Sequence, residues 1–159
     1  MHKWLALTMA AALAAVDQLI KLWALSSLAG SGIAVIPGVF SLILVRNTGA
    51  AFGLLSGQRI FLIIMVSLVI LCGIIAVASG RVNSKPLVWI ISLIIAGGIG
   101  NLIDRIYLGY VVDYLSFGSF PVFNFADCCV VSGTFLLAVY MLRKEKSDIG
   151  AENTDPEGS

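Results

Sequence analysis

Two aspartates, Asp113 and Asp127, are the residues of this sequence best suited to chemistry. Neither has a basic residue within one or two helical turns, and both lie beside or within apolar segments, where an uncompensated charge is costly. Two carboxylates brought close together share one proton near neutral pH. The ionised member can take a proton from water as the water attacks a carbonyl group, while the protonated member donates to the carbonyl oxygen. The pair therefore predicts hydrolysis by general acid–base catalysis.

Other catalytic chemistries lack the residues that they need. His2 is the sole histidine, which excludes a Ser-His-Asp triad, a Cys-His pair and a histidine zinc motif. Cys128 and Cys129 are adjacent and cannot both pair with Cys72, so no disulfide framework follows. The net charge is +1 and the basic residues are scattered, so we expect no nucleic-acid partner. We also expect neither a metal nor a cofactor.

Two further aspartates in apolar segments have basic neighbours. Asp17 and Lys21 stand four residues apart with the acid first, a spacing that places both side chains on one helix face. We interpret them as a structural ion pair, the usual state of charges inside a membrane. Asp104 is followed by Arg105 where an apolar segment ends. We expect both to reach water or lipid headgroups and to stabilise the helix end.

The composition predicts a membrane protein. Of the 159 residues, 59% are hydrophobic and 12% are charged, whereas a soluble domain has roughly 25% charged residues. Four apolar segments approach the roughly 20 residues that a helix needs to cross a bilayer. They are Trp4–Leu25, Ile60–Ala78, Leu87–Ile103 and Val122–Leu142. We therefore predict an all-α polytopic membrane protein with four transmembrane helices.

Basic residues indicate how these spans are oriented. They gather at the N-terminus, in the second connection and after the fourth span, as Lys3, Arg81, Lys85, Arg143, Lys144 and Lys146. By the positive-inside rule, both termini are then cytoplasmic, and residues 26–59 and 104–121 lie on the outer side.

Composition also divides the regions outside the spans. Val39–Val45 is β-branched and aromatic and is bounded by turn residues, so we predict a strand there. Residues 147–159 are polar and acidic without apolar periodicity. We predict one transmembrane domain over residues 1–146 and a disordered cytoplasmic tail after it.

Five short runs of polar and small residues follow one another along the chain. They are Asp17-Gln18-Leu19-Ile20-Lys21, Asn47-Thr48-Gly49-Ala50-Ala51-Phe52, Gly97-Gly98-Ile99-Gly100-Asn101-Leu102-Ile103-Asp104-Arg105, Gly109-Tyr110-Val111-Val112-Asp113-Tyr114 and Phe123-Asn124-Phe125-Ala126-Asp127. In sequence and order these runs resemble the bacterial lipoprotein signal peptidases, the type II signal peptidases. Each run alone is a weak signal, whereas together they are highly specific.

The resemblance implies an aspartyl endopeptidase whose catalytic dyad is Asp113 and Asp127. Its substrates would be lipoprotein precursors that carry a diacylglyceryl group on a cysteine, cut just before that cysteine. The resemblance also implies a small β element and a short helix on the outer (periplasmic) face of the bacterial inner membrane. It places further residues in substrate binding or site support, namely Asn47, Gly49, Asn101, Arg105, Asn124 and Ala126. We expect a monomer that also contacts membrane lipid.

Two other classes of protein remain open. A small proton-coupled transporter would also keep unpaired aspartates in its membrane segments, although its carboxylates are expected near the midplane, often within an internal repeat. The acids here cluster toward one face, and no repeat is visible. A scaffold protein leaves two uncompensated acids unexplained, and it would tolerate Asp113→Asn and Asp127→Asn.

Overall fold

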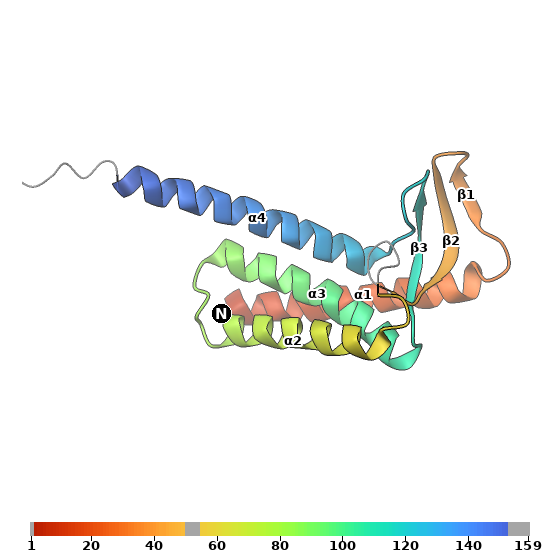
Figure 1. The fold of residues 1–159 in the computed structure, drawn as a ribbon, viewed down its shortest axis with the longest axis horizontal. Helices are drawn as coiled ribbons and strands as arrows, with labels where there is room; N and C mark the ends of the chain where they lie inside the picture. The colour runs from red at the N-terminus through yellow and green to blue at the C-terminus, as the bar shows by residue number, and fades with distance from the viewer. Residues whose placement is uncertain (1, 50–54, 153–159) are drawn as a thin grey trace, which may run out of the picture.

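Four helices and three strands make up the computed structural model, which describes residues 2–49 and 55–152. In chain order they are α1 (His2–Ser27), β1 (Ile33–Ile36), β2 (Phe40–Asn47), α2 (Arg59–Ala78), α3 (Lys85–Tyr107), β3 (Val111–Phe117) and α4 (Phe125–Glu152). The strands stand together at one end of the helices, away from the N-terminus (Figure 1). Within the described residues, four helices are long and apolar enough to cross a membrane, as predicted.

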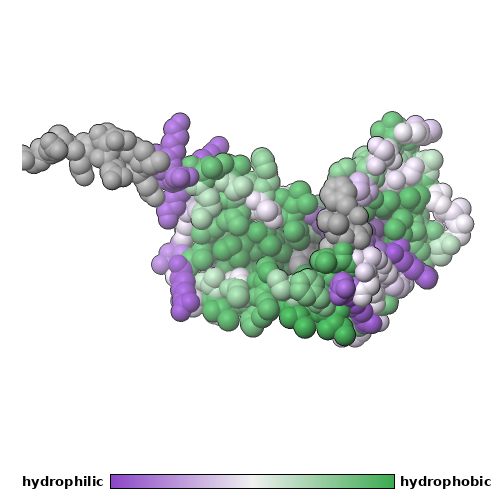
Figure 2. All heavy atoms as spheres, viewed as in Figure 1, coloured by the Kyte–Doolittle hydropathy of each residue, from purple (hydrophilic) through white to green (hydrophobic). Residues whose placement is uncertain are grey.

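Small side chains bring the helices close together, and large apolar side chains face outward. α3 packs against each of the other three helices. On α1 the buried face is formed by Ala6, Ala10 and Ala14, four residues apart, which suits close packing between membrane helices. Leu19 and Leu22 on the same helix are more than half exposed. The apolar belt between the two ends of the molecule (Figure 2) is the surface expected of a protein whose solvent is lipid.

Gly97 on α3 sets how closely α4 approaches, and its replacement is our first prediction. A β-carbon at Gly97 would collide with the carbonyl oxygen of Ala126 and would lie 2.7 Å from Cγ2 of Val130. Gly97→Ala should therefore push α4 away and cost about 1–3 kcal/mol, measured as a lower melting temperature in detergent. The matched control is Gly98→Ala, where the nearest atom is a side-chain carbon of Ile70 at 3.1 Å that can shift. Equal melting of the two variants would contradict this account.

The sheet is antiparallel, with strand order β1-β2-β3. The strand predicted over Val39–Val45 is confirmed, because it corresponds to the middle strand, β2. In the β2–β3 register Val45 lies opposite Asp113, and Asn47 lies opposite Val111. This register places Asn47 next to Asp113 at the end of the sheet that joins the helices. In the described residues between the spans, the regular elements are these strands, so the small β element is confirmed and the short helix is not.

The fourth span begins later and ends later than the sequence analysis predicted. Phe123 exchanges two backbone hydrogen bonds with Leu115 of β3, at 3.0 and 2.8 Å, so the chain stays extended where the prediction began a helix at Val122. α4 therefore starts at Phe125 and then continues to Glu152, beyond the predicted start of the tail at Ser147. Lysine, glutamate and alanine propagate a helix without needing an apolar face. Residues 153–159 lie outside the described part of the chain.

Candidate active site

Asp113 and Asp127 are brought together by a single asparagine. The side-chain Nδ2 of Asn124 donates to Oδ1 of Asp113 at 2.7 Å. The backbone N–H of the same residue donates to Oδ2 of Asp127 at 3.2 Å. Asp113 lies on β3 and Asp127 in the first turn of α4, so the junction between sheet and bundle is the point where the two carboxylates converge.

Asn124 also begins α4 by capping it. Its Oδ1 accepts from the backbone N–H of Asp127 at 2.8 Å, while the Asp127 carboxylate accepts from the backbone N–H of Asn124. This reciprocal pair satisfies N–H groups that a helix start leaves free, in the manner of a capping box. The spacing of three residues between Asn124 and Asp127 predicts a hydrogen bond between them, and the structure confirms it. The position of Asn124 was predicted wrongly, because it precedes the helix and does not lie inside the span.

Asp113 is almost fully enclosed, at 1% exposure. Its Oδ2 accepts from Nδ2 of Asn47 at 2.9 Å, which adds β2 to the elements around the pair. Burial raises the pKa of Asp113 to about 6; the nearby charge of Asp127 adds to this, and the hydrogen bonds from the two asparagines oppose it. Asp113 therefore holds a proton more readily near neutral pH than an ordinary aspartate does.

This shift predicts a pH-dependent stability, our second prediction. Below about pH 4 an aspartate is protonated in both the folded and unfolded states, and the folded chain keeps its proton up to about pH 6. Stability from this group is therefore complete below about pH 4 and is lost as the pH rises through about 6. Relative to Asp113→Asn, the wild type should lose up to about 3 kcal/mol between pH 4 and 7. The measurement is thermal unfolding in detergent across this pH range. If the pKa of Asp113 were not raised, the stabilities of the wild type and of Asp113→Asn would change with pH in parallel.

Asp127 receives its second donor from α3. Nδ2 of Asn101 donates to Oδ1 of Asp127 at 2.7 Å. The other end of this amide, Oδ1 of Asn101, accepts from Nζ of Lys21 at 2.9 Å and from Nδ2 of Asn124 at 3.1 Å. A continuous chain of hydrogen bonds thus runs from α1 through α3 to the carboxylate on α4.

The predicted ion pair between Asp17 and Lys21 is present, but it belongs to a larger cluster. Nζ of Lys21 lies 2.8 Å from Oδ2 of Asp17 and 3.0 Å from Oδ2 of Asp104. Asp104 is 2% exposed and also accepts from the backbone N–H of Val112 at 2.9 Å. The expectation that Asp104 reaches water or headgroups is therefore wrong. The chain folds back after α3, so β3 and α1 cover this residue.

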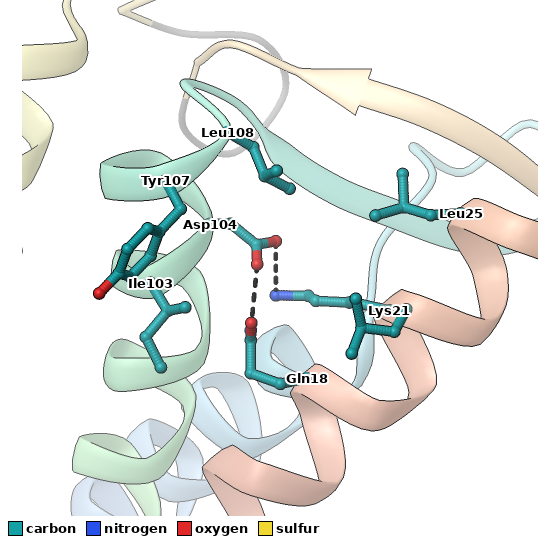
Figure 3. A pocket seen from close by; sticks show the side chains of 8 residues that line it. Gln18, Lys21, Leu25, Ile103, Asp104, Tyr107 and Leu108 are labelled. Carbon is teal, nitrogen blue, oxygen red and sulfur yellow. Dashed lines mark hydrogen bonds and ion pairs between the residues drawn. The ribbon is translucent and has the colours of Figure 1, made fainter.

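Gln18 completes the cluster and was not singled out from the sequence. Its Nε2 donates to Oδ1 of Asp104 at 3.0 Å and to the carbonyl oxygen of Gly100 at 3.1 Å. Beside it, a hollow of about 180 Å³ opens between α1 and α3, lined by Gln18, Lys21, Asp104 and five apolar or aromatic side chains (Figure 3). Neither Asp113 nor Asp127 lines this hollow, so it is separate from the carboxylate pair.

Arg105 points into the protein, not toward headgroups as expected. It is 9% exposed, and its Nη2 donates to the carbonyl oxygen of Gly49 at 2.8 Å. Gly49 in turn donates its backbone N–H to Oδ1 of Asn47 at 2.9 Å. Arg105 thus fixes the chain that follows β2 and adds a positive charge near both Asp113 and Asp127. Within the second sequence run, residues 50–52 lie outside the described part of the chain.

Two backbone N–H groups at the start of α4 are held by other elements. Ala126, which is fully buried, donates to Oδ1 of Asp17 at 2.9 Å. Phe125 donates to the hydroxyl oxygen of Tyr114 on β3 at 3.3 Å. Burial raises the pKa of this tyrosine to about 12, so its hydroxyl remains neutral. These contacts fix the helix start that carries Asp127.

The fold and the site define a multi-pass membrane protein in which two carboxylates, of the buried Asp113 and the half-buried Asp127, meet where the sheet joins the helices. The structure brings together the side chains or backbone groups of all the predicted site residues, including Asn47, Asn101 and Asn124. Such a pair can activate a water molecule at one carboxylate and protonate an oxygen or a leaving group from the other.

Known proteins share both the sequence and the fold. A sequence model described as signal peptidase (SPase) II matches residues 9–143. The lipoprotein signal peptidase of Halothermothrix orenii is 44% identical over 131 residues, covering 82% of this chain and 90% of that protein. The lipoprotein signal peptidase of Streptococcus thermophilus is 42% identical over 137 residues, covering 84% and 90%. A bacterial membrane enzyme solved by the in meso method at 2.3 Å has a TM-score of 0.80 at 27% identity and covers 97% of this chain and 93% of its own.

The chain belongs to the signal peptidase II family. It is therefore a multi-pass bacterial membrane peptidase, and the transporter and scaffold interpretations have no support from these relatives.

Proposed function

We propose that this chain removes signal peptides from lipoprotein precursors, with Asp113 and Asp127 as an aspartyl dyad. The relatives are named lipoprotein signal peptidases, which supports the substrate class. The observation that carries the mechanism is the convergence of two carboxylates on Asn124, at 2.7 and 3.2 Å. Asn47, Asn101 and Asn124 give these carboxylates four hydrogen bonds, so their oxygens are held in a fixed arrangement.

In this mechanism Asp113 begins as the acid and Asp127 as the base. The raised pKa of Asp113, about 6, supports its holding the shared proton. Asp127 takes a proton from water while the water oxygen attacks the carbonyl carbon of the peptide bond, and Asp113 gives its proton to the carbonyl oxygen. When the tetrahedral intermediate collapses, Asp113 takes back a proton from one of its hydroxyl groups and the carbonyl re-forms. The carbon–nitrogen bond breaks, and the amine leaves with the proton held by Asp127. At the end of the cycle Asp113 is again protonated and Asp127 is again ionised.

We place both termini in the cytoplasm and the dyad toward the outer face of the inner membrane. The helix ends away from the strands carry Lys3 near the start of α1, Arg81 after α2 and Lys85 at the start of α3. Positively charged ends of this kind favour the cytoplasm. The dyad lies at the opposite end, beside the sheet, which supports cleavage near the outer surface. The site is assembled within one chain, which supports a monomeric enzyme.

The lipid on the substrate is the finer part of the proposal. We propose that the precursor carries a diacylglyceryl group on its cysteine and is cut just before that cysteine. Apolar side chains of the sheet region, such as Val35, Ile36 and Val39, are about half exposed. They would favour a substrate held at the lipid surface.

A cleavage assay with purified protein in detergent tests the proposed function. One precursor is offered with and without its diacylglyceryl group, and mass spectrometry of the product locates the cut. Cleavage of the lipidated precursor alone, just before the modified cysteine, is the expected result. Equal cleavage of both precursors would refute the lipid requirement, and a cut elsewhere would refute the proposed position.

A further inference from the structure

Each asparagine that donates to the dyad has its side-chain oxygen held by a group that can only donate. Oδ1 of Asn47 accepts from the backbone N–H of Gly49 at 2.9 Å, and Oδ1 of Asn124 accepts from the backbone N–H of Asp127 at 2.8 Å. A backbone N–H cannot accept a hydrogen bond, so the oxygen of the amide must face it. The NH₂ groups of these two asparagines are thereby directed at Asp113.

For Asn101 the group that donates to the side-chain oxygen is a charged side chain. Its Oδ1 accepts from the ammonium group of Lys21 at 2.9 Å, and its Nδ2 donates to Asp127 at 2.7 Å. A lysine ammonium has three donors and no acceptor, so it permits one orientation of this amide. A longer bond of 3.1 Å from Asn124 supports the same orientation.

We propose that Lys21 is a positioning residue of the reaction, whose ammonium group orients Asn101 so that its NH₂ group donates to Asp127. This inference rests on the proposed function of the dyad. It assigns Lys21 a part beyond its ion pairs. The lysine is 2% exposed, and its three short contacts go to Asp17, Asp104 and Asn101, so one of its three donors is used on the neutral amide.

Loss of the Asn101 orientation should make Asp127 a poorer base and should leave substrate binding unchanged. If the Asn101 amide turned over, its oxygen would face the Asp127 carboxylate, and two acceptors would oppose each other. The ionised carboxylate would then be disfavoured, and the shared proton would move toward the residue that must accept one from water. Lys21 is 2% exposed and its short contacts are all within the protein, so we expect the KM to stay unchanged.

The test must keep the local charge constant, because several charged or titratable groups surround the dyad. They come from α1, α3, β3 and α4 as Asp17, Lys21, Asp104, Arg105, Asp113, Asp127 and Cys128. The double variant Asp17→Asn/Lys21→Met removes one charge of each sign. Asp104 keeps its donors from Gln18 and Val112 in this variant.

Two matched variants separate orientation from ion pairing. Asp17→Asn alone breaks the same pair but keeps the lysine on Asn101, and Asp17→Asn/Lys21→Gln restores a neutral N–H donor. We expect the kcat for lipidated precursor to fall about 10- to 100-fold in the methionine variant. In a plot of kcat against pH, the acidic limb of this variant should move to higher pH. The kcat of the other two variants should fall several-fold less than that of the methionine variant, because both keep an N–H donor on Asn101. A merely structural role would affect all three variants alike.

A folded methionine variant with the wild-type kcat and pH profile would overturn the inference. Activity in Asp113→Asn or Asp127→Asn would instead overturn the proposed function, so the two failures are distinguishable. If the methionine variant does not fold, Asn101→Asp carries the test, because a carboxyl group facing Asp127 can donate only while protonated. Its kcat relative to wild type should fall about tenfold or more between about pH 5 and pH 8. A constant ratio would overturn the inference.

Discussion

Replacing either Asp113 or Asp127 with asparagine is expected to reduce cleavage of a lipidated precursor by about 10³-fold or more. Asparagine keeps the size of the side chain and its capacity to accept a hydrogen bond, but it can neither take a proton from water nor return one to the leaving amine. General acid–base groups contribute about 10²- to 10⁴-fold each. Purified variants are compared in a gel-shift cleavage assay at equal protein concentration.

A carboxylate outside the site provides the control for this loss. Glu145 is exposed on α4 and lies about 27 Å further along the helix than Asp127, at about 1.5 Å per residue. Glu145→Gln should therefore cleave at the wild-type rate. Melting in detergent near neutral pH must show that the aspartate variants remain folded. Undiminished cleavage by a folded Asp113→Asn or Asp127→Asn variant would exclude the dyad.

The second large effect is expected on stability, from Lys21→Met. Asp17 and Asp104 are 1% and 2% exposed, and both lie within 3.0 Å of the lysine nitrogen. Removing the cation leaves two buried carboxylates without their shared partner. Breaking a buried ion pair from one side typically costs about 3–5 kcal/mol. We therefore expect a large drop in the melting temperature in detergent, or failure of the variant to insert and fold.

A second substitution in the same cluster tests whether unpaired carboxylates cause the loss of stability. Adding Asp17→Asn to Lys21→Met removes one of the two stranded carboxylates, so much of the lost stability should return. Asp17→Asn alone should be mild, because Lys21 keeps Asp104 as its partner. Lys146→Met, at an exposed position on α4, should change stability by less than about 0.5 kcal/mol. A single Lys21→Met variant as stable as the Lys146→Met control would show that the buried charges do not depend on the lysine.

The sequence by itself determined the four spans and the strand, and it singled out the aspartate pair that we propose as the dyad. These features depend on local properties of the chain. An apolar run of about 20 residues crosses a bilayer whatever its neighbours are, and an acid without a basic neighbour in such a run is visible by inspection. The i,i+4 spacing of Asp17 and Lys21 likewise fixes their proximity once a helix forms.

The tertiary structure decided which partners those residues meet. Asp104 and Lys21 are 83 positions apart, and their contact exists because α1 docks against α3. The start of α4 was mispredicted because the backbone of Phe123 pairs with a strand, a competition that apolar periodicity does not report. The orientation of Asn101 follows from a lysine on another helix. Long-range hydrogen bonds depend on how the helices and the sheet pack together, and hydropathy along one chain carries no information about that geometry.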